Sequence, residues 1–438
     1  MIGASTDQLK TGYVILRNLI NGGFRGSIYP VNPKASEILG LKTYKSVDEI
    51  PNQIDLAIIA VAARNVISAI DDCIRAKVGG IVIISAGFRE TGQIGTELEE
   101  EISERVKSSG IRTIGPNSAG IVNSSVNMCA TIEGTPMKGP VALLSQSGAL
   151  GGATFGWAED VGLGFSKFAS IGNMCDVNFN DLLEYLAQDP ETKVITMYVE
   201  SIGDGSRFVS VAKNVSLVKP ILAYKVGRTG AGQRATLSHT GSLATSDNIY
   251  DGAFRQAKII RVYDAEELLD YAYALTHQPL PKGGRVGILT DAGGPGVAAT
   301  DACTLSGLEV PELPDSIQTK LKQILPPFAS TKNPVDMTFS LNSKLYQDCI
   351  DLILSENAVD ALIITITSHL EVQQELANTI VASFGSGGKP FLVSWTASRA
   401  ADPARGILRR RGIPVYSTPE KTARALACLA RYSRSVHE

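Results

Sequence analysis

The sequence predicts an α/β protein whose parallel sheets are covered by helices on both faces. Short apolar runs of strand length, such as residues 56–63 and 80–86, recur along the chain, and amphipathic segments of helical period separate them. Turns containing Gly, Ser or Asn close many of these runs. In such folds, right-handed crossovers bring the carboxyl end of every strand to the edge where ligands bind. Functional residues are therefore expected at the strand ends.

Two breaks rich in Gly and Pro, residues 133–140 and 277–284, divide the chain into three predicted domains. A chain of 438 residues is too long for one hydrophobic core, which supports this division. The domains are expected at residues 1–126, 140–276 and 284–438. The first is Rossmann-like, and Met1 and Ile2 correspond to the end of its first strand, so we expect that strand to be truncated.

The remaining elements follow from the same alternation of apolar runs and helical patterns. Helices are expected from about Gly12, from the turn at Ser147 to about Val161, and from about Asp247. The predicted strands lie at residues 26–31, 55–61, 80–85, 111–114, 141–144, 194–199, 221–225, 285–289, 360–365, 390–395 and 413–416.

Composition excludes several classes of function. Hydrophobic residues make up 44% of the chain and charged residues 19%, and the net charge is −3, so no broad basic surface for nucleic acid or membranes is expected. The apolar runs are far too short for a membrane helix. The six cysteines are scattered without a CxxC pair, which predicts no metal site and no disulfide framework. Reduced thiols in the cytoplasm are the expected state.

Small and amide residues follow successive strands of the first domain, where they would shape one crevice. A glycine turn before a helix allows close approach of a pyrophosphate. An NAD site would place an acidic residue after the second strand, whereas this chain has Asn32-Pro33-Lys34 there. A phosphorylated nucleotide such as coenzyme A (CoA) therefore fits better than NAD. The candidate binding residues are Gly3, Ala4, Ser5, Asn32, Lys34, Ser85, Ala86, Gly87 and Asn117.

Two further strand-to-helix turns predict phosphate sites. Ser145, Ser147 and Gly148 lie where a strand gives way to a helix, so hydroxyls and backbone N–H groups meet at a positive helix end. A nucleophilic serine at this turn is the alternative, but the first glycine of a nucleophile elbow is missing. Gly293 and Gly294 open a helix in the same way in the third domain.

The most informative segment is the Gly-, Ser- and Thr-rich stretch 228–244, which is expected to be a long loop carrying His239. A neutral imidazole can attack a phosphoryl group when an anion on its other nitrogen fixes the tautomer. Glu200 ends the strand at 194–199 on the ligand edge of the same domain and is the candidate anion. Taken singly, either residue would be read as an ordinary surface group.

Taken together, these motifs resemble the α part of the ADP-forming acyl-CoA synthetases, in the superfamily of succinyl-CoA synthetase. The resemblance covers essentially the whole chain, and its most specific motif is the run SHTGSLA at residues 238–244. The runs LSQSGAL at 144–150 and AGGPG at 292–296 support it, as do YPVNPK at 29–34 and SAGFRE at 85–90.

The resemblance implies a CoA-binding Rossmann-like domain followed by two flavodoxin-like ligase domains. It makes His239 the residue that is transiently phosphorylated and Glu200 its stabilising carboxylate. The implied enzyme is an acid–thiol ligase that uses CoA, phosphate and ADP/ATP with Mg²⁺. In such enzymes the nucleotide binds an ATP-grasp unit, fused or on a β subunit. The three predicted domains leave no room for one, so such a partner and a hetero- or homo-oligomer are expected.

Three alternatives remain open at the level of sequence. A non-catalytic CoA-binding regulatory module of the same superfamily is the nearest one, although retention of both His239 and Glu200 argues against it. An NAD(P)-dependent oxidoreductase is disfavoured by the missing GxGxxG turn and ribose-binding acid. A serine hydrolase is the most distant. The acyl group is not readable from the residues.

Overall fold

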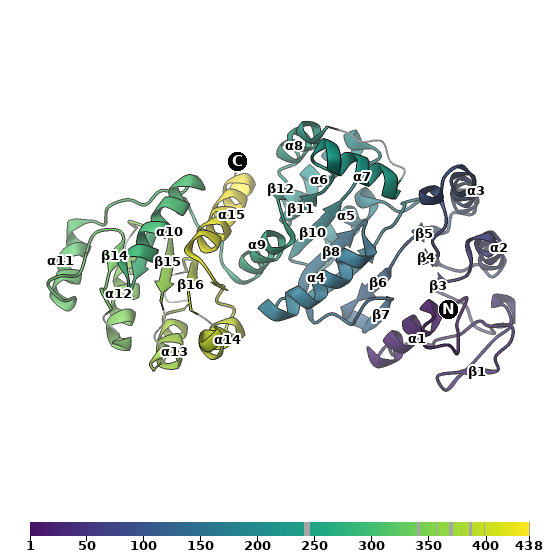
Figure 1. The fold of residues 1–438 in the computed structure, drawn as a ribbon, viewed down its shortest axis with the longest axis horizontal. Helices are drawn as coiled ribbons and strands as arrows, with labels where there is room; N and C mark the ends of the chain where they lie inside the picture. Colours follow the sequence, from purple (N-terminus) through teal and green to yellow (C-terminus); the bar gives the residue numbers. More distant parts are fainter. Residues whose placement is uncertain are drawn as a thin grey trace. The chain divides into compact units, whose positions relative to one another are not determined.

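The computed structural model describes residues 1–240, 246–339, 342–355, 357–367, 371–384, 388–397 and 399–437, apart from the side chains of residues 237–240 (Figure 1). The chain forms two compact units, residues 1–265 and 266–438. Both contain mostly parallel sheets with helices between the strands, which confirms the predicted α/β class. The division into three domains stays a prediction. No helix in the described ranges is both long and apolar enough to cross a membrane.

The first sheet of unit 1 is parallel and has the strand order β3-β4-β5. Ile2 extends it, because this residue bridges both Ile59 and Val31. The predicted strand at 26–31 is wrong: within it only Val31 makes bridges, to Ile2 and Tyr44, and Pro30 before it has no N–H to donate to a ladder. The elements of this part are α1 (Thr11–Asn21), β1 (Glu37–Ile38), β2 (Leu41–Lys42), β3 (Leu56–Ile59), α2 (Val66–Arg75), β4 (Gly80–Ile83), a short 3-10 helix (Arg89–Thr91), α3 (Gln93–Ser109) and β5 (Arg112–Ile114).

The second sheet of unit 1 has seven strands in the order β12-β11-β10-β8-β9-β6-β7. The strands from β8 to β12 pair in parallel, whereas β6 and β7 join antiparallel at one side. The strands are β6 (Gly120–Asn123), β7 (Met128–Thr131), β8 (Lys138–Ser145), β9 (Phe165–Ser170), β10 (Val194–Val199), β11 (Ile221–Lys225) and β12 (Ile260–Val262). The helices are α4 (Gly148–Val161), α5 (Phe179–Gln188), α6 (Gly205–Ser216), α7 (Gly230–Thr240) and α8 (Asp247–Gln256).

The predicted loop at 228–244 is wrong over Gly230–Thr240, which forms α7. The hydroxyl of Thr229 accepts a hydrogen bond from the N–H of Gly232 at 3.0 Å, so the helix has a side-chain cap. Ala, Gln and Arg, which favour helix, follow the two glycines. The glycines and hydroxyl residues that suggested a loop are therefore tolerated within a capped helix. Residues 241–245 lie outside the described part.

Unit 2 contains a parallel sheet with the order β14-β13-β15-β16-β17. Its central strands are fully buried, which explains their continuous apolar sequences. The strands are β13 (Val286–Thr290), β14 (Val335–Asp336), β15 (Ala361–Ile366), β16 (Phe391–Trp395) and β17 (Val415–Tyr416). The helices are α9 (Ala265–His277), α10 (Gly293–Leu305), α11 (Asp315–Ile324), α12 (Ser343–Ser355), α13 (Gln373–Ser383), α14 (Asp402–Arg410) and α15 (Pro419–His437).

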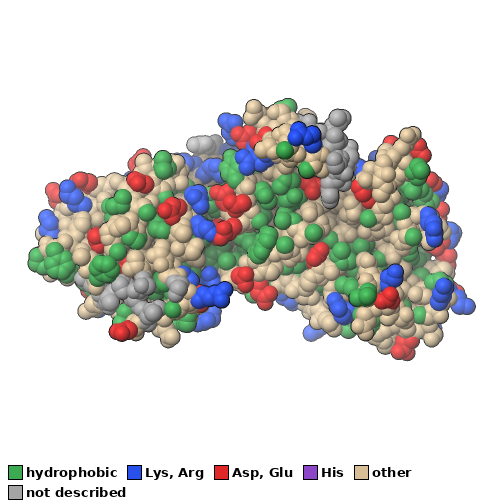
Figure 2. Space-filling view, in the orientation of Figure 1, with side chains coloured by type: hydrophobic (Ala, Val, Ile, Leu, Met, Phe, Trp, Pro, Cys, Tyr) green, Lys and Arg blue, Asp and Glu red, His purple; other side chains and the backbone are tan. Residues whose placement is uncertain are grey.

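The surface carries charges of both signs side by side. Figure 2 shows Lys and Arg interspersed with Asp and Glu over the visible face of each unit. This mixture agrees with the small net charge of −3. The drawn face therefore has no broad region of a single sign of the kind that steers polyanions.

Close packing of α4 on β9 sets the position of the turn before that helix. Gly151 is buried, and a Cβ built on it would lie 2.6 Å from a ring atom of Phe168. Gly156 lies in the same helix on its exposed side, and a Cβ there would meet nothing within 4 Å. The two glycines thus have opposite roles, one in contact with the sheet and one in open space.

We predict that Gly151→Ala destabilises unit 1, whereas Gly156→Ala stabilises it. Overpacking against Phe168 costs about 1–3 kcal/mol, whereas replacing an exposed helical glycine contributes about 1 kcal/mol of stability. Urea unfolding followed by the fluorescence of Trp157, which lies in α4, measures both changes. Equal stabilisation by the two substitutions would contradict the close packing of α4 on β9.

Candidate functional site

Parallel pairing brings the carboxyl ends of the central strands of unit 1 to one edge. Ser145 at the end of β8 pairs with Tyr198 of β10 on one side and with Ser170 of β9 on the other. Val199 pairs with Lys225, the last residue of β11. The turns that follow these strands therefore lie side by side, as predicted for the ligand edge.

The turn between β8 and α4 presents two backbone donors. The Ser147 hydroxyl caps α4 by accepting the N–H of Leu150 at 3.4 Å. No acceptor from the described part of the chain lies within hydrogen-bond reach of the N–H groups of Gly148 and Ala149. Two N–H groups at the positive end of a helix of 14 residues suit a phosphate oxygen.

Ser145, one of the predicted phosphate-site residues, stabilises this turn from its buried side. Its side chain is fully buried, and its hydroxyl donates to the carbonyl of Ser147 at 2.6 Å and accepts the N–H of Ser147 at 3.2 Å. Both hydrogen-bonding functions of the hydroxyl are thus used within the turn. Ser145 shapes the turn, and the donors of Gly148 and Ala149 face outward.

A cavity of about 510 Å³ lies over this turn and the strand ends of the first sheet. Two further predicted residues, Ser85 and Asn117, are held in its wall. Ser85 donates to the carbonyl of Val61 at 2.6 Å, and Asn117 has a left-handed backbone with φ of +58°. The predicted residues that line the cavity are Ser85, Ala86, Asn117, Ser147 and Gly148.

The other predicted residues of the first domain lie outside this lining. Gly3 has φ of +86°, and a Cβ there would lie 2.2 Å from the carbonyl oxygen of Ala60, so only glycine fits. Asn32 donates to the carbonyl of Ala4 at 2.7 Å and so links the first two strand ends. The hydroxyl of Ser5 accepts the N–H of Asp7, and the side chain of Lys34 is exposed.

Gly87 lies at the turn after β4, with φ of +106° and its N–H donating to Glu90 at 2.6 Å. Burial raises the pKa of Glu90, but hydrogen bonds from the N–H groups of Gly87, Phe88 and Glu90 itself and from the amide of Asn173 together outweigh it and lower the pKa overall. The carboxylate form of Glu90 therefore holds the glycine turn beside the cavity.

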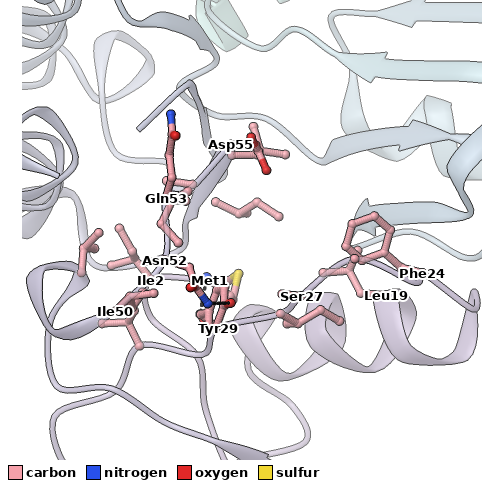
Figure 3. A pocket seen from close by; sticks show the side chains of 18 of the residues that line it. Met1, Ile2, Leu19, Phe24, Ser27, Tyr29, Ile50, Asn52, Gln53 and Asp55 are labelled. Carbon is pink, nitrogen blue, oxygen red and sulfur yellow. Dashed lines mark hydrogen bonds between the residues drawn. The ribbon is translucent and has the colours of Figure 1, made fainter. Parts of the chain in front are cut away.

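A second cavity, of about 320 Å³, surrounds Met1 and opens at the amino ends of the same strands (Figure 3). The ammonium group of Met1 donates to the carbonyl of Tyr29 at 2.9 Å, and burial lowers its pKa to about 6. Leu19, Phe24 and Ile50 contribute apolar lining. Because it lies at the opposite edge from the strand ends, this cavity is separate from the predicted ligand edge.

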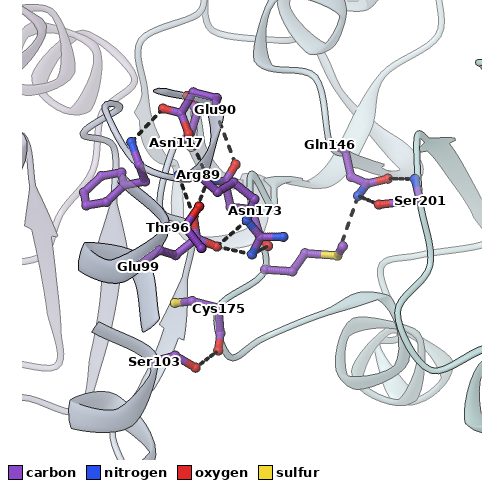
Figure 4. Close-up of polar contacts among 12 residues, drawn as sticks. Arg89, Glu90, Thr96, Glu99, Ser103, Asn117, Gln146, Asn173, Cys175 and Ser201 are labelled. Carbon is purple, nitrogen blue, oxygen red and sulfur yellow. Dashed lines mark hydrogen bonds and ion pairs between the residues drawn. The ribbon is translucent and has the colours of Figure 1, made fainter. Parts of the chain in front are cut away.

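A polar cluster that the sequence interpretation missed joins the two sheets of unit 1 (Figure 4). The guanidinium of Arg89 pairs with the buried carboxylate of Glu99, with 2.5 Å from Nε to Oε1, and donates to the carbonyl of Asn173. The amide of Asn173 donates to Glu99 at 2.7 Å, and Asn117 donates to Asn173 at 3.4 Å. Asn173 follows β9, a strand omitted from the prediction, so recognising that strand would have found it.

The structure places the backbone of His239 near the C-terminal end of α7, whereas its side chain lies outside the described residues. Helix α7 contacts the 3-10 helix Arg89–Thr91, next to the turn at Gly87. Glu200 follows β10 directly, and only 9% of its surface is exposed. Both predicted catalytic residues thus belong to unit 1.

Lys225, the last residue of β11, is buried at the same edge. Its ammonium group donates to the carbonyl of Val226 and lies 4.5 Å from the ring centre of Tyr250. Burial lowers the pKa of Lys225 to about 8, with the charge of Asp247 partly opposing this change. The site therefore contains a buried cation close to the end of β10.

Unit 2 repeats the turn architecture of β8 and α4. The hydroxyl of Thr290 donates to the carbonyl of Ala292 at 2.6 Å and accepts its N–H at 3.2 Å, as Ser145 does with Ser147. The predicted Gly293 and Gly294 are the first residues of α10. A Cβ on Gly294 would meet nothing within 4 Å, so this position is open to an approaching group.

Three family models match the chain in succession. A CoA binding domain matches residues 1–124, a succinyl-CoA ligase-like flavodoxin domain matches residues 138–275, and a ligase-CoA domain matches residues 286–438. The α subunit of an ADP-forming acetate–CoA ligase II from Pyrococcus furiosus is 42% identical over 448 residues. That similarity covers all of this chain and 96% of the relative.

The chain belongs to the family of the ADP-forming acyl-CoA synthetases.

Other members of this family show the same correspondence. The ADP-forming acetate–CoA ligase of Methanocaldococcus jannaschii is 42% identical over 439 residues, which are 99% of this chain but 62% of that relative. A solved structure, a dinucleotide-forming acetyl-coenzyme A synthetase 1 of Candidatus Korarchaeum cryptofilum in complex with phosphate and ADP, superposes with a TM-score of 0.94. It is 38% identical and covers 100% of this chain and 95% of that chain.

The thiols and acidic groups of this acyl-CoA synthetase chain give no sign of metal or disulfide chemistry. All six cysteines are buried and unpaired, and burial raises the pKa of Cys73, Cys175 and Cys303 to about 12. Within the described ranges, no group of three or more His, Cys, Asp or Glu side chains is arranged to hold a metal ion.

We predict that the stability difference between the wild type and Lys225→Met depends on pH. Below pH 8 the lysine is protonated in both the folded and the unfolded state, and burial of the charge disfavours folding. Between pH 8 and the ordinary lysine value of 10.5, the unfolded state holds more protons, so the contribution of Lys225 to stability rises with pH. We expect the difference to move by about 2 kcal/mol in favour of the wild type between about pH 7.5 and about pH 9.5.

Urea unfolding of both proteins at the two pH values checks this, because all other titrating groups cancel in the difference. A difference that stays constant, or moves in favour of Lys225→Met, would contradict the buried position of the ammonium group.

Proposed function

We propose that this chain is the catalytic α part of an ADP-forming acyl-CoA synthetase. The reaction interconverts acyl-CoA, phosphate and ADP with carboxylic acid, CoA and ATP. The observation that carries the proposal is the arrangement at one edge of unit 1. There, the free N–H groups of Gly148 and Ala149, the cavity over them and the buried Glu200 occupy adjacent strand ends.

In the first step, phosphate bound at the N-terminus of α4 attacks the thioester of acyl-CoA. An oxygen of phosphate forms a bond to the carbonyl carbon, and the C–S bond breaks with its electron pair leaving on the CoA sulfur, which takes up a proton. The products are an acyl phosphate and free CoA. The N–H groups of Gly148 and Ala149 would hold the phosphate oxygens and orient the attack.

In the second step, a ring nitrogen of His239 attacks phosphorus and the P–O bond to the acyl group breaks. The electron pair leaves with the carboxylate product, and the imidazole becomes a positively charged phosphohistidine. Glu200 would hold the other ring nitrogen and stabilise this charge. An oxygen of the β-phosphate of ADP then takes the phosphoryl group, which gives ATP and restores the imidazole.

CoA is assigned to the strand ends of the first domain. The residues proposed for it are Gly3, Ala4, Ser5, Asn32, Lys34, Ser85, Ala86, Gly87 and Asn117. Ser85, Ala86 and Asn117 carry the clearest support, because they line the cavity over the turn between β8 and α4. The second helix N-terminus, at Gly293 and Gly294 of α10, is proposed as a further phosphate-binding turn.

The nucleotide step is proposed to need an ATP-grasp unit that binds ADP/ATP with Mg²⁺. Two relatives support this. The match covers only 62% of the M. jannaschii ligase, which therefore contains further sequence. The P. furiosus relative, which is matched over almost its whole length, is named as an α subunit. A β subunit or a fused domain would serve equally. The buried, unpaired thiols support the cytoplasm as the location.

We predict that His239→Ala abolishes ATP formation from acetyl-CoA, phosphate and ADP when an ATP-grasp subunit is supplied. Loss of the nucleophile should lower the rate by at least about 10³-fold. His437→Ala removes a histidine at the exposed end of α15 and should leave the rate unchanged. A coupled assay of ATP formation measures the rate of each variant. An active His239→Ala protein would refute the phosphohistidine step.

We predict that Glu200→Gln slows phosphorylation of His239 by about 10²-fold or more, because a neutral amide cannot stabilise the developing imidazolium charge. Glu191→Gln makes the same chemical change at an exposed position and is the matched control. Rapid-quench measurement of the phosphohistidine formed in one turnover gives the rate. Equal rates for the two variants would remove Glu200 from the mechanism.

A further inference from the structure

The turn after β10, defined as Glu200–Ile202, is held through its backbone by a glutamine from the neighbouring strand end. The N–H groups of Glu200 and Ser201 both donate to Oε1 of Gln146, at 2.6 and 3.0 Å. The amide nitrogen of Gln146 donates in return to the hydroxyl of Ser201 at 3.4 Å (Figure 4). One amide group thus satisfies two successive backbone donors of the turn that carries Glu200.

The backbone of Gln146 is attached to the same strand. Its N–H donates to the carbonyl of Tyr198 at 3.3 Å, which continues the ladder of β8 and β10 beyond Ser145. Gln146 therefore contacts the end of β10 through both its main chain and its side chain. Since Ser145 and Ser147 flank it, the residue lies within the proposed phosphate turn itself.

The other end of the turn is held from α8. The N–H of Ile202 donates to the phenol oxygen of Tyr250 at 3.3 Å, and the ring of Tyr250 is buried under the ammonium group of Lys225. Three consecutive backbone N–H groups are thus held by side chains from two different elements. Such over-determination fixes the direction in which the side chain of Glu200 leaves the backbone.

We propose that Gln146 is a positioning residue for phosphoryl transfer, which fixes the carboxylate of Glu200 relative to the phosphate bound at α4. The inference rests on the proposed function and adds a residue to it. Tyr250 supports the same turn from the other side. A displacement of the turn at Gln146 would therefore also displace Glu200, the residue proposed to hold the histidine.

The chemistry of the amide explains why glutamine suits this position. A neutral amide accepts two N–H groups and donates one without placing a charge beside Glu200. A glutamate would keep the acceptor oxygen, but it would lose the donor and introduce a like charge, which disfavours ionisation of a neighbouring carboxyl. Methionine has a similar length and provides neither function.

The test compares Gln146→Met with Gln188→Met, which makes the same change at an exposed position of α5. Each full-length protein is mixed with acetyl-CoA and phosphate, and phosphohistidine is measured in a single turnover. We expect Gln146→Met to lower the rate constant by about 10–100-fold, since a small misplacement of a catalytic group has effects of this size. The concentration of acetyl-CoA at half-maximal rate should change less than about threefold, because that variant leaves the other walls of the cavity intact.

The dependence of the phosphorylation rate on pH distinguishes a positioning role of Gln146 from a merely structural one. In Gln146→Glu, the added carboxylate should shift the acid limb of the rate profile to higher pH, because Glu200 must then ionise beside a like charge. Among the described residues, the ionisable groups near Glu200 include Tyr198 on β10, Lys225 on β11 and Tyr250 on α8, and they are the same in both proteins. Tyr250→Phe, which keeps the ring under Lys225, should give a smaller loss in the same rate constant.

Three results would overturn the inference. The first is a rate constant for Gln146→Met equal to that of Gln188→Met. The second is a fall in the rate constant of Gln146→Met that is matched by an equal weakening of acetyl-CoA binding, together with a pH profile for Gln146→Glu that is not shifted. The third is a wild-type protein that forms no phosphohistidine even with ATP and an ATP-grasp subunit, a result that would refute the proposed function as well.

Discussion

The parallel pairing of β8 with β10 is the interaction on which the arrangement of the site depends. It places Ser145 opposite Tyr198, and the hydrogen bond from the N–H of Gln146 to the carbonyl of Tyr198 carries the ladder into the turn. The phosphate turn and the turn with Glu200 therefore move together. A register slip of one residue in β10 would turn its side chains to the opposite face of the sheet and break this pairing.

Both units use the same way of turning a buried strand into a helix N-terminus. In each, a buried hydroxyl at the last strand position, Ser145 or Thr290, closes a hydrogen-bonded ring on the backbone two residues later. The ring bends the chain sharply, so the first N–H groups of α4 and α10 point away from the sheet. In the proposed mechanism, the hydroxyl residues at these positions would therefore act on phosphate through the backbone that they shape.

The sequence was sufficient for the fold class, for β10 and β11 over their full lengths, and for the helix that ends at Val161, because strong apolar periods and Gly-rich turns mark these elements. It was insufficient for α7, where the glycines that suggested a loop sit in a helix capped by Thr229. It also missed Gln146 and Asn173 as members of the site. Their roles come from partners 54 and 74 residues away, Glu200 and Glu99, and no local pattern records such contacts.

The central claim is that His239 carries the phosphoryl group, and direct detection of phosphohistidine tests it best. The chain is incubated with acetyl-CoA and isotope-labelled phosphate, and the peptide containing His239 is examined by mass spectrometry under alkaline conditions. We expect one acid-labile phosphoryl group on His239 that appears only when acyl-CoA is present. Label on a different residue, or a bare His239 even with ATP and an ATP-grasp subunit, would contradict the account and indicate a CoA-binding module without catalysis.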